Sequence, residues 1–411
     1  MNTLLIKNIS LKNRIVDVLI EGNVFKQIEP NIKAGKVDKI IDGTNRAIIQ
    51  PFYNMHTHSS MTLLRGYGDD MRLFQWLSEY IWPQEAKLTP EDIYNGTRLA
   101  IVEMIRSGTV FFLDMYWHHS EIIRAVEEMK IRASIGVSFI EERGKREIEQ
   151  NIKFINGFVS PLERISINVA PHAIYTVGKD LYQELYMISK VKGLKLSTHL
   201  AETMQEVKSC KKANNNLTPT EFLESIGVLD DNTIAAHCVH LTEHDAEILS
   251  SKGVTLVHNP CANMKLASGS FNVPLINKYD LKVCLGTDGT SSNNNLSMLE
   301  EMKFAALLAK VSYKDSSLLS ANQVFAWATK NGADAMGINS GRIKEGRLAD
   351  CLIVNLNNER LIPNNNLISN WVYSADSRCI ETVICDGNIL MENHIIPNEE
   401  EILEKVKRKI M

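Results

Sequence analysis

The stretch "AIIQPFYNMHTH", residues 47–58, is a short apolar run that ends in two histidines one residue apart. Side chains alternate across a β-strand, so residues i and i+2 point to the same side. His56 and His58 can therefore point the same way from the end of one strand. Taken alone, such a pair is a weak signal for metal binding, because most pairs of this kind are surface or core residues.

Further short apolar runs follow along the chain, and stretches with helical character separate them. This alternation is typical of a parallel α/β sheet, and about eight runs match the strand count of a (β/α)8 TIM barrel. A helix over 90–107 is predicted, with Thr89 as N-cap and Pro90 first. Thr242 and Asp245 predict a capping box. The runs cover residues 47–58, 109–115, 132–140, 165–172, 194–202, 232–240, 253–260 and 281–289.

The two ends of the chain differ from this middle part. Residues 1–46 and about 345–396 contain short strand-like runs with turns and no long helix. We expect both ends to meet in a small β-sandwich domain into which the barrel is inserted. The predicted division is 1–50 for the N-terminal part of this domain, 51–344 for the catalytic barrel, and 345–411 for the C-terminal part plus a terminal helix.

Composition narrows the classes of partner. The formal charge is −4 and no basic cluster is present, which argues against nucleic acid and a membrane surface. No signal peptide and no membrane span is indicated, so we expect a cytoplasmic protein with a small-molecule partner. Seven cysteines form an odd set without CxxC spacing, which indicates reduced, packed thiols. The sequence leaves the oligomeric state open, with a homo-oligomer among the alternatives.

Polar residues stand at the carboxyl ends of most runs. In a barrel the active site forms where the strands end, so these side chains are expected to converge on one face. One such histidine would most often be a packed or capping residue, but so many at one face predict a site. They are His56, His58, Asp114, His118, His172, His199, Glu202, His237, His240, His258 and Asp288.

Three imidazoles and a carboxylate, from His56, His58, His199 and Asp288, make a ligand set that suits catalytic zinc and leaves a position for water. A divalent ion lowers the pKa of its water toward about 7. Glu202, three residues after His199, is the predicted proton carrier; the alternative is a solvated glutamate that opens the next helix.

His237 is expected to orient or polarise the attacked group, or else to be a packed core histidine. The cytidine-deaminase type of site is excluded, because it needs H-x-E and P-C-x-x-C. This chain has "HLAE" and "PCANM" instead.

These residues, in this order, resemble the amidohydrolase superfamily, and most closely its 5-methylthioadenosine/S-adenosylhomocysteine deaminases. The resemblance runs nearly end to end. It implies hydrolytic deamination of an adenosine-type nucleoside to the inosine analogue and ammonia, with one Zn²⁺ per subunit and Fe²⁺ as the alternative ion. It is carried by "NMHTHSSMTLLRGYGDD", "WPQEAKLT", "APHAIYT", "STHLAET", "AAHCVH", "VHNPCANMKLASG" and "GTDGTSSNNNLSMLEEM".

The resemblance also implies residue roles. Asp288, besides holding zinc with the three histidines, exchanges a proton with the bound water. Glu202 moves protons between water, the purine N1 and the leaving ammonia, and His237 supports the attack. Glu85 in "WPQE" contacts the ribose hydroxyls, and His172 in "PHAIY" contacts the purine.

The substrate itself is left open by the sequence. Trp82 is either a pocket wall or an ordinary buried tryptophan. Arg143 and Arg146, after the third strand, either hold the carboxylate of a homocysteine tail or are solvated. Methylthioadenosine, S-adenosylhomocysteine, adenosine and 5′-deoxyadenosine are all candidates. Guanine-type bases or s-triazines on the same scaffold are the alternative, and a non-catalytic barrel protein is less favoured because the full ligand set is present.

Overall fold

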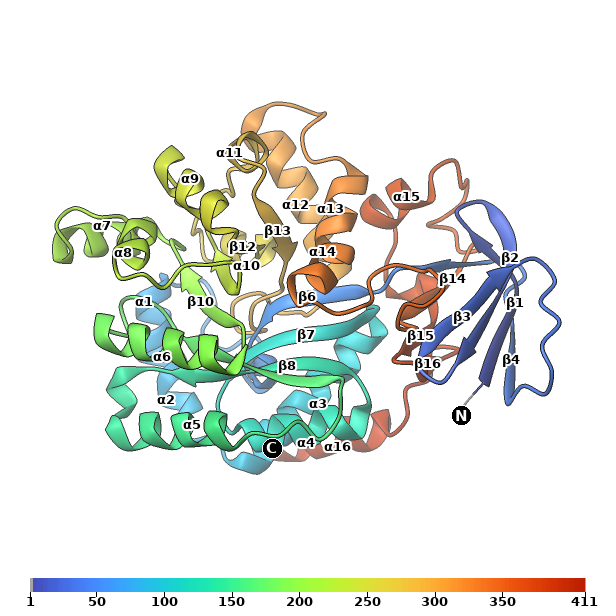
Figure 1. Cartoon of the computed structure of the whole chain (residues 1–411), viewed down its shortest axis with the longest axis horizontal. Coiled ribbons are helices and arrows are strands. Elements are labelled where there is room, and N and C mark those ends of the chain that lie inside the picture. Colours follow the sequence, from blue (N-terminus) through green and yellow to red (C-terminus); the bar gives the residue numbers. More distant parts are fainter. Residues whose placement is uncertain (1–2, 411) are drawn as a thin grey trace.

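The computed structural model describes residues 3–410, apart from the side chains of residues 409 and 410. Eight parallel strands stand side by side in chain order and close into a barrel (Figure 1). The barrel closes where the backbone N–H groups of Thr287 and Asp288 donate to the carbonyl of His56, at 3.1 and 3.0 Å. The predicted (β/α)8 barrel is thus confirmed. Its strands are β6 (Phe52–Thr57), β7 (Thr109–Tyr116), β8 (Arg132–Phe139), β9 (Ile165–Pro171), β10 (Leu196–Leu200), β11 (Thr233–His237), β12 (Thr255–His258) and β13 (Lys282–Leu285).

Gly286 permits this closure. A Cβ atom at this position would lie 2.6 Å from Oδ1 of Asn259 and 2.8 Å from the backbone nitrogen of His56. Only a residue without a side chain lets the last barrel strand approach the first so closely. The closure therefore brings His56 and Asp288, which are far apart in the sequence, to the same point of the barrel rim.

Helices surround the barrel, and the two whose starts the sequence predicts begin there. Thr89 Oγ1 accepts a hydrogen bond from the backbone N–H of Asp92, and the Asp92 carboxylate accepts one from the backbone of Thr89. Thr242 and Asp245 form the same capping box. The helices are η1 (Ser59–Leu64), α1 (Leu73–Trp76), η2 (Leu77–Ile81), α2 (Trp82–Glu85), α3 (Pro90–Arg106), α4 (His119–Met129), η3 (Glu141–Arg143), α5 (Lys145–Gly157), α6 (Lys179–Lys192), α7 (Met204–Ala213), α8 (Pro219–Ser225), α9 (Glu243–Lys252), α10 (Pro260–Lys265), α11 (Val273–Lys278), α12 (Met298–Tyr313), α13 (Ala321–Ala328), α14 (Lys330–Ala335), α15 (Leu367–Tyr373), η4 (Ser377–Cys379) and α16 (Glu399–Ile410).

The two ends of the chain share a second sheet. The two halves of this sheet enclose a common apolar core, to which Leu4, Ile20, Ile353 and Ile384 contribute. This arrangement matches the predicted β-sandwich built from both termini. Its strands run in the order β16-β15-β14-β5-β1-β2-β3, with β4 on β1. They are β1 (Thr3–Leu11), β2 (Arg14–Glu21), β3 (Val24–Glu29), β4 (Lys39–Asp42), β5 (Arg46–Ile49), β14 (Cys351–Asn355), β15 (Ile380–Cys385) and β16 (Asn388–Glu392).

The run 47–58 is divided between the two sheets. Its first part is in β5, which pairs with β1 and β14, and its second part is β6 of the barrel. Pro51 lies between them and has no N–H with which to continue a ladder, which accounts for the break. The predicted domain limits stay a prediction.

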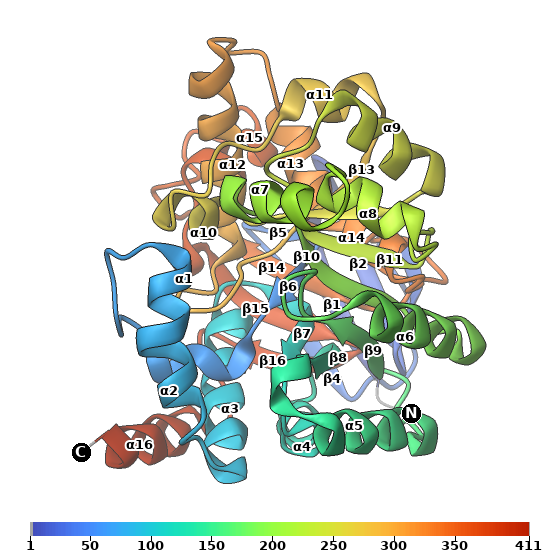
Figure 2. The same ribbon diagram turned by 90° about the vertical axis from the view of Figure 1, so that its left-hand side faces the viewer.

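The C-terminal helix lies against the barrel. α16 runs beside α3 (Figure 2), and Nη2 of Arg98 lies 2.6 Å from Oε2 of Glu401. Arg106 on α3 pairs with Glu399 in the same way. The seven cysteines are all free, as predicted. Among the helices of the described residues, none is long and apolar enough to cross a membrane.

Candidate active site

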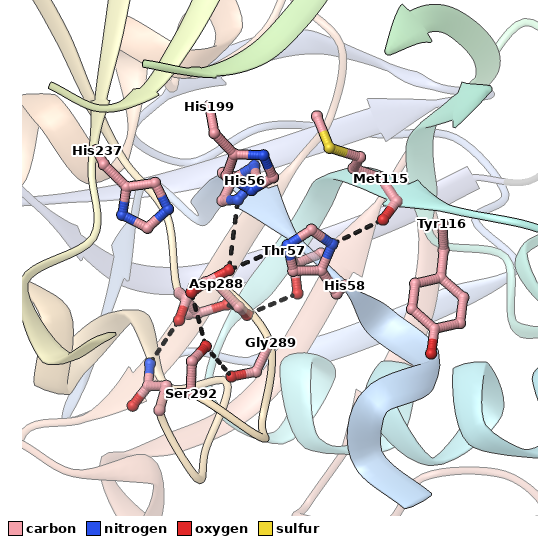
Figure 3. Close-up of polar contacts among 12 residues, drawn as sticks. His56, Thr57, His58, Met115, Tyr116, His199, His237, Asp288, Gly289 and Ser292 are labelled. Atoms are coloured by element: carbon pink, nitrogen blue, oxygen red, sulfur yellow. Dashed lines mark hydrogen bonds and ion pairs between the residues drawn. The ribbon is translucent and has the colours of Figure 1, made fainter. Parts of the chain in front are cut away.

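Five predicted residues converge at the carboxyl ends of the barrel strands (Figure 3). Donor atoms of His56, His199, His237 and Asp288 all lie within 4.8 Å of one another, and all four side chains are buried. Nε2 of His58 lies 3.1 Å from Oδ1 of the same Asp288. The structure therefore gathers the four predicted metal ligands and also draws in His237, which the sequence placed in a supporting role.

The imidazoles of His58 and His199 are each held by a hydrogen bond from Nδ1 to a backbone carbonyl. The acceptors are the carbonyl of Met115 for His58 at 2.7 Å, and the carbonyl of His172 for His199 at 2.8 Å. A carbonyl can only accept, so Nδ1 carries the proton and Nε2 keeps its lone pair. Such partners fix the orientation of metal-binding histidines.

His237 is oriented by a side chain instead. Its Nδ1 lies 2.8 Å from Oδ1 of Asn263, so it donates to that amide oxygen. Its Nε2 is thereby left free to act toward the centre of the site. Asn263 is itself fully buried on α10, which makes it a rigid support.

The donor set fits a divalent metal ion. Nε2 of His56 is buried without a hydrogen-bond partner, although it lies 3.4 Å from Oδ1 of Asp288. A buried imidazole nitrogen without a partner is costly unless it binds something. Ser292 Oγ donates to Oδ2 of Asp288 at 2.6 Å and orients the carboxylate. Burial works against its ionisation, but the adjacent imidazoles of His56 and His58 hold the pKa of Asp288 well below its usual range.

The backbone at three strand ends adopts the left-handed conformation. φ is +50° at Ala201, +72° at His237, +48° at Cys238 and +58° at Asp288. Residues with a side chain rarely adopt such angles, and clusters of them mark functional sites. The N–H of Cys238 donates to the carbonyl of Leu200 at 2.9 Å, which helps to hold the distorted turn in place.

Glu202 lies beside the metal site. Its Oε2 is 3.9 Å from Nε2 of His237, and Ser268 Oγ donates to its Oε1 at 3.3 Å. Glu206 fixes the turn by accepting the backbone N–H of Ala201 and of Glu202, at 2.9 and 2.8 Å. Burial raises the pKa of Glu202. A carboxyl group in this environment can hold and release a proton, as general acid–base catalysis requires.

A pocket opens from this centre. Glu85 lies at another part of its wall, where the hydroxyl of Tyr116 donates to Oε1 at 2.8 Å. Burial raises the pKa of Glu85 to about 7. The half-buried Trp82 also faces the pocket. The lining comprises His58, Met61, Leu73, Trp76, Leu77, Trp82, Glu85, Met115, Tyr116, Trp117, Ser138, Ile140, His172, Tyr175, His199, Glu202, His237, Leu266, Asp288 and Ser292.

The two predicted arginines, Arg143 and Arg146, are not among the residues that line the pocket. The guanidinium of Arg143 stacks over the ring of Trp117, 3.7 Å from its centroid, and its Nη1 is 3.3 Å from Glu147. Arg146 is exposed on α5. Trp117 lines the pocket and Arg143 does not, but the Arg143 guanidinium is close enough to oppose the effect of burial on the pKa of Glu85.

Other strand-end histidines also stay out of the cluster. His258 stacks on Phe271 with centroids 4.3 Å apart. His240 Nε2 is 2.7 Å from the carbonyl of Ser268, and His118 is exposed at the start of α4. A position at a strand end is therefore not enough to place a histidine in the site.

Tyr116, Asn263 and Ser292 were missed by the sequence reasoning. Each acts through a predicted site residue: Tyr116 bonds to Glu85, Asn263 to His237 and Ser292 to Asp288. The available signal was proximity to the site motifs: Asn263 lies in "VHNPCANMKLASG" and Ser292 in "GTDGTSSNNN". Which neighbour of a ligand supports it depends on the folded turn, and the sequence pattern alone does not reveal it.

A barrel with buried histidine and aspartate ligands at its strand ends and a proton-carrying carboxyl beside them defines a metal-dependent hydrolase. The model of the Amidohydrolase family matches residues 49–390, and the chain belongs to this family.

Several relatives are similar over nearly the whole length. The chain is 44% identical to a 5′-deoxyadenosine deaminase of Methanosphaera stadtmanae, covering 98% of this chain and 97% of that protein. It is 43% identical to 5-methylthioadenosine/S-adenosylhomocysteine deaminase 1 of Archaeoglobus fulgidus, covering 95% and 94%. Among solved structures, an adenosine deaminase from Xanthomonas campestris with bound zinc superposes with a TM-score of 0.93 at 28% identity, covering 99% and 97%.

Proposed function

We propose that the protein hydrolyses the exocyclic amine of an adenosine-type nucleoside, giving the inosine analogue and ammonia. One observation carries this proposal: Glu202, a buried carboxyl with a raised pKa, lies 3.9 Å from His237 at the metal site, and the same pocket holds a second buried carboxyl, Glu85. The first suits proton transfer at a purine and the second suits a ribose diol. The names of the two similar deaminases support the same reaction.

The proposed ion is one zinc per subunit, with Fe²⁺ as the alternative, because imidazole ligands suit both metals. A bound divalent ion supplies a water molecule that is acidic at neutral pH. Asp288, held as the carboxylate, accepts a proton from the attacking water. His237 orients that water through Nε2, since Asn263 holds its Nδ1. Glu202 gives its proton to the purine N1, takes up the proton of the hydroxyl group added at C6 as the carbonyl forms, and delivers that proton to the departing amine.

Substrate contacts follow from the pocket wall. Glu85, as the carboxylate, accepts hydrogen bonds from the ribose hydroxyls. His172 contacts the purine, because its ring lies beside that of His199, with centroids 4.7 Å apart. Its Nδ1 is tied to Oγ1 of Thr176 at 2.9 Å, which fixes the ring. Trp82 forms part of the wall.

The remaining wall favours a neutral 5′ substituent. Leu73, Trp76, Leu77 and Leu266 line it, and among the described residues none that lines this pocket is a lysine or an arginine. Burying a carboxylate without a cationic partner is unfavourable. We therefore propose 5′-deoxyadenosine or methylthioadenosine as substrate, rather than S-adenosylhomocysteine with its charged amino-acid tail.

The test is ammonia release from a panel of 5′-deoxyadenosine, methylthioadenosine, adenosine, deoxyadenosine, S-adenosylhomocysteine, guanine and a triazine. The expected result is the highest kcat/KM for the nucleosides with a neutral 5′ group. Ammonia release from guanine or the triazine, without turnover of any nucleoside, would overturn the proposal. Turnover of S-adenosylhomocysteine at the rate of methylthioadenosine would overturn only the proposed preference for a neutral 5′ substituent.

A separate experiment tests which metal ion the protein binds and whether activity requires it. Metal content of the purified protein is measured, the ion is removed with a chelator, and activity is measured after addition of Zn²⁺ or Fe²⁺. Full recovery with zinc at one equivalent per chain is expected. Activity that survives complete removal of metal would contradict the assigned site.

A further inference from the structure

Lys265, the last residue of helix α10, lies where three segments of the chain meet. Its ammonium nitrogen is 2.6 Å from Oδ1 of Asp69 and 3.2 Å from the carbonyl oxygen of Ser291, and it also donates to Oδ1 of Asn294. An ammonium group has three N–H donors, so these three acceptors use all of them. Most lysines extend into solvent, but this side chain is only 24% exposed. Its contacts therefore need an explanation.

The first acceptor belongs to the segment that builds the apolar wall of the pocket. Asp69 lies four residues before Leu73, where helix α1 begins. α1 and the residue that follows it place Leu73, Trp76 and Leu77 in the pocket lining. The ion pair between Asp69 and Lys265 therefore fixes the start of this wall relative to α10.

The other two acceptors belong to the loop after β13, which carries Asp288. Ser291 directly precedes Ser292, whose Oγ donates to Oδ2 of Asp288 at 2.6 Å (Figure 3). Asn294 lies two residues after Ser292. Lys265 thus holds the loop on both sides of the serine that orients the Asp288 carboxylate.

Helix α10 itself contributes to both parts of the site. Asn263 accepts the hydrogen bond from Nδ1 of His237 at 2.8 Å, and Leu266, which directly follows Lys265, lines the pocket. A shift of α10 relative to its neighbours would move both side chains. The three contacts of Lys265 oppose such a shift.

We propose that Lys265 is a positioning residue that fixes the substrate pocket relative to the metal donors. Through Asp69 it holds the apolar wall, and through Ser291 and Asn294 it holds the loop of Asp288. Lys265 lies outside the pocket lining, so it acts through these neighbours and not on the substrate. The effect on substrate binding rests on the proposed deaminase function, whereas the effect on the metal site does not.

The test breaks the two connections separately. Asp69→Ala removes the acceptor next to the wall, so KM for the best nucleoside substrate is expected to rise about fivefold, with kcat and Zn²⁺ affinity unchanged. Asn294→Gly removes the acceptor on the loop, and glycine tolerates the φ of +76° at this position. In this variant kcat and Zn²⁺ affinity, measured by competition with a chelator, are each expected to fall about tenfold, with KM unchanged.

Lys265→Met breaks both connections at once. Methionine is similar in length but has no N–H donor, so KM is expected to rise while kcat and Zn²⁺ affinity fall. Lys278→Met on α11 is the matched control, because Lys278 also forms an ion pair, 2.8 Å from Oε1 of Glu243, but both side chains are exposed. The control is expected to keep the wild-type KM, kcat and Zn²⁺ affinity.

Two results would overturn the proposal. One is a Lys265→Met variant with wild-type KM, kcat and Zn²⁺ affinity. The other is an equal change of KM and kcat in Asp69→Ala and Asn294→Gly, because a general loss of structure would not separate the two constants. These two variants also decide the outcome if Lys265→Met does not fold.

Failure of the proposed function has a different signature. In that case the wild type turns over no nucleoside, but the Zn²⁺ affinities can still be compared. A tenfold loss in Asn294→Gly, with none in Asp69→Ala, would still support the role of Lys265 at the metal site. Equal Zn²⁺ affinity in the wild type and Asn294→Gly would contradict it.

Discussion

The hydroxyl of Tyr116 donates a hydrogen bond of 2.8 Å to Oε1 of Glu85, and both side chains are buried at the pocket wall. Burial raises the pKa of Glu85 to about 7, and the bond from Tyr116 acts in the opposite direction. Near neutral pH, Glu85 is therefore divided between its protonated and its ionised form. The proposed role of Glu85, which is to accept hydrogen bonds from a ribose diol, is then sensitive to small changes of pH.

The first prediction concerns the pH dependence of kcat/KM. Below pH about 7 Glu85 binds a proton in the free enzyme, and the neutral acid has less capacity to accept the ribose hydroxyls. We expect kcat/KM for 5′-deoxyadenosine or methylthioadenosine to fall as the pH drops through 7. Glu85→Gln should have a lower kcat/KM without this acid limb. An unchanged limb in Glu85→Gln would assign it to another group.

The second prediction concerns Tyr116→Phe. This change removes the hydrogen bond that stabilises the Glu85 carboxylate, so the pKa of Glu85 rises and the acid limb of kcat/KM moves to higher pH. Tyr94→Phe is the matched control, because the Tyr94 hydroxyl bonds Glu128 outside the pocket. The two pH profiles are compared with the same nucleoside. A limb at the same pH in Tyr116→Phe and in the wild type would mean that the bond does not control Glu85.

The third prediction concerns Glu202→Gln. The amide keeps the size of the side chain but cannot carry the proton to N1, so kcat should fall about 10²–10⁴-fold. Metal content should stay at the wild-type level, because Glu202 is outside the metal cluster. Glu184→Gln, an exposed position on α6, serves as the control and should keep full activity. A Glu202→Gln variant with normal turnover and normal metal content would exclude the proton-carrier role.

The barrel could be predicted because its signals are local. Each strand is an apolar run of its own, and capping boxes such as Thr89 with Asp92 mark the helix starts within four residues. The proximity of the candidate metal ligands could be predicted for a related reason. In a parallel barrel every strand ends at the same rim, so His56 and Asp288 had to be neighbours once the strand count was right.

Other features depend on contacts that no local pattern contains. His258 and His237 both end barrel strands, yet His258 stacks on Phe271 and His237 lies in the cluster with His56, His199 and Asp288. The two strand ends also differ in the backbone, because His237 has a φ of +72° and His258 is not among the residues with a positive φ. Arg143 was equally ambiguous, because only the folded chain shows that it stacks on Trp117.

The fourth prediction concerns the support of His237. Asn263→Ala removes the acceptor of its Nδ1–H, so the imidazole loses its fixed tautomer and orientation. Loss of such a partner typically costs 10–100-fold in metal affinity or activity, and we expect a loss of this size in kcat. Asn263→Asp keeps an acceptor oxygen at the same position and should retain more activity than the alanine variant. Metal affinity is measured in parallel by competition with a chelator. If the alanine and aspartate variants lose the same activity, Asn263 contributes packing and does not orient His237.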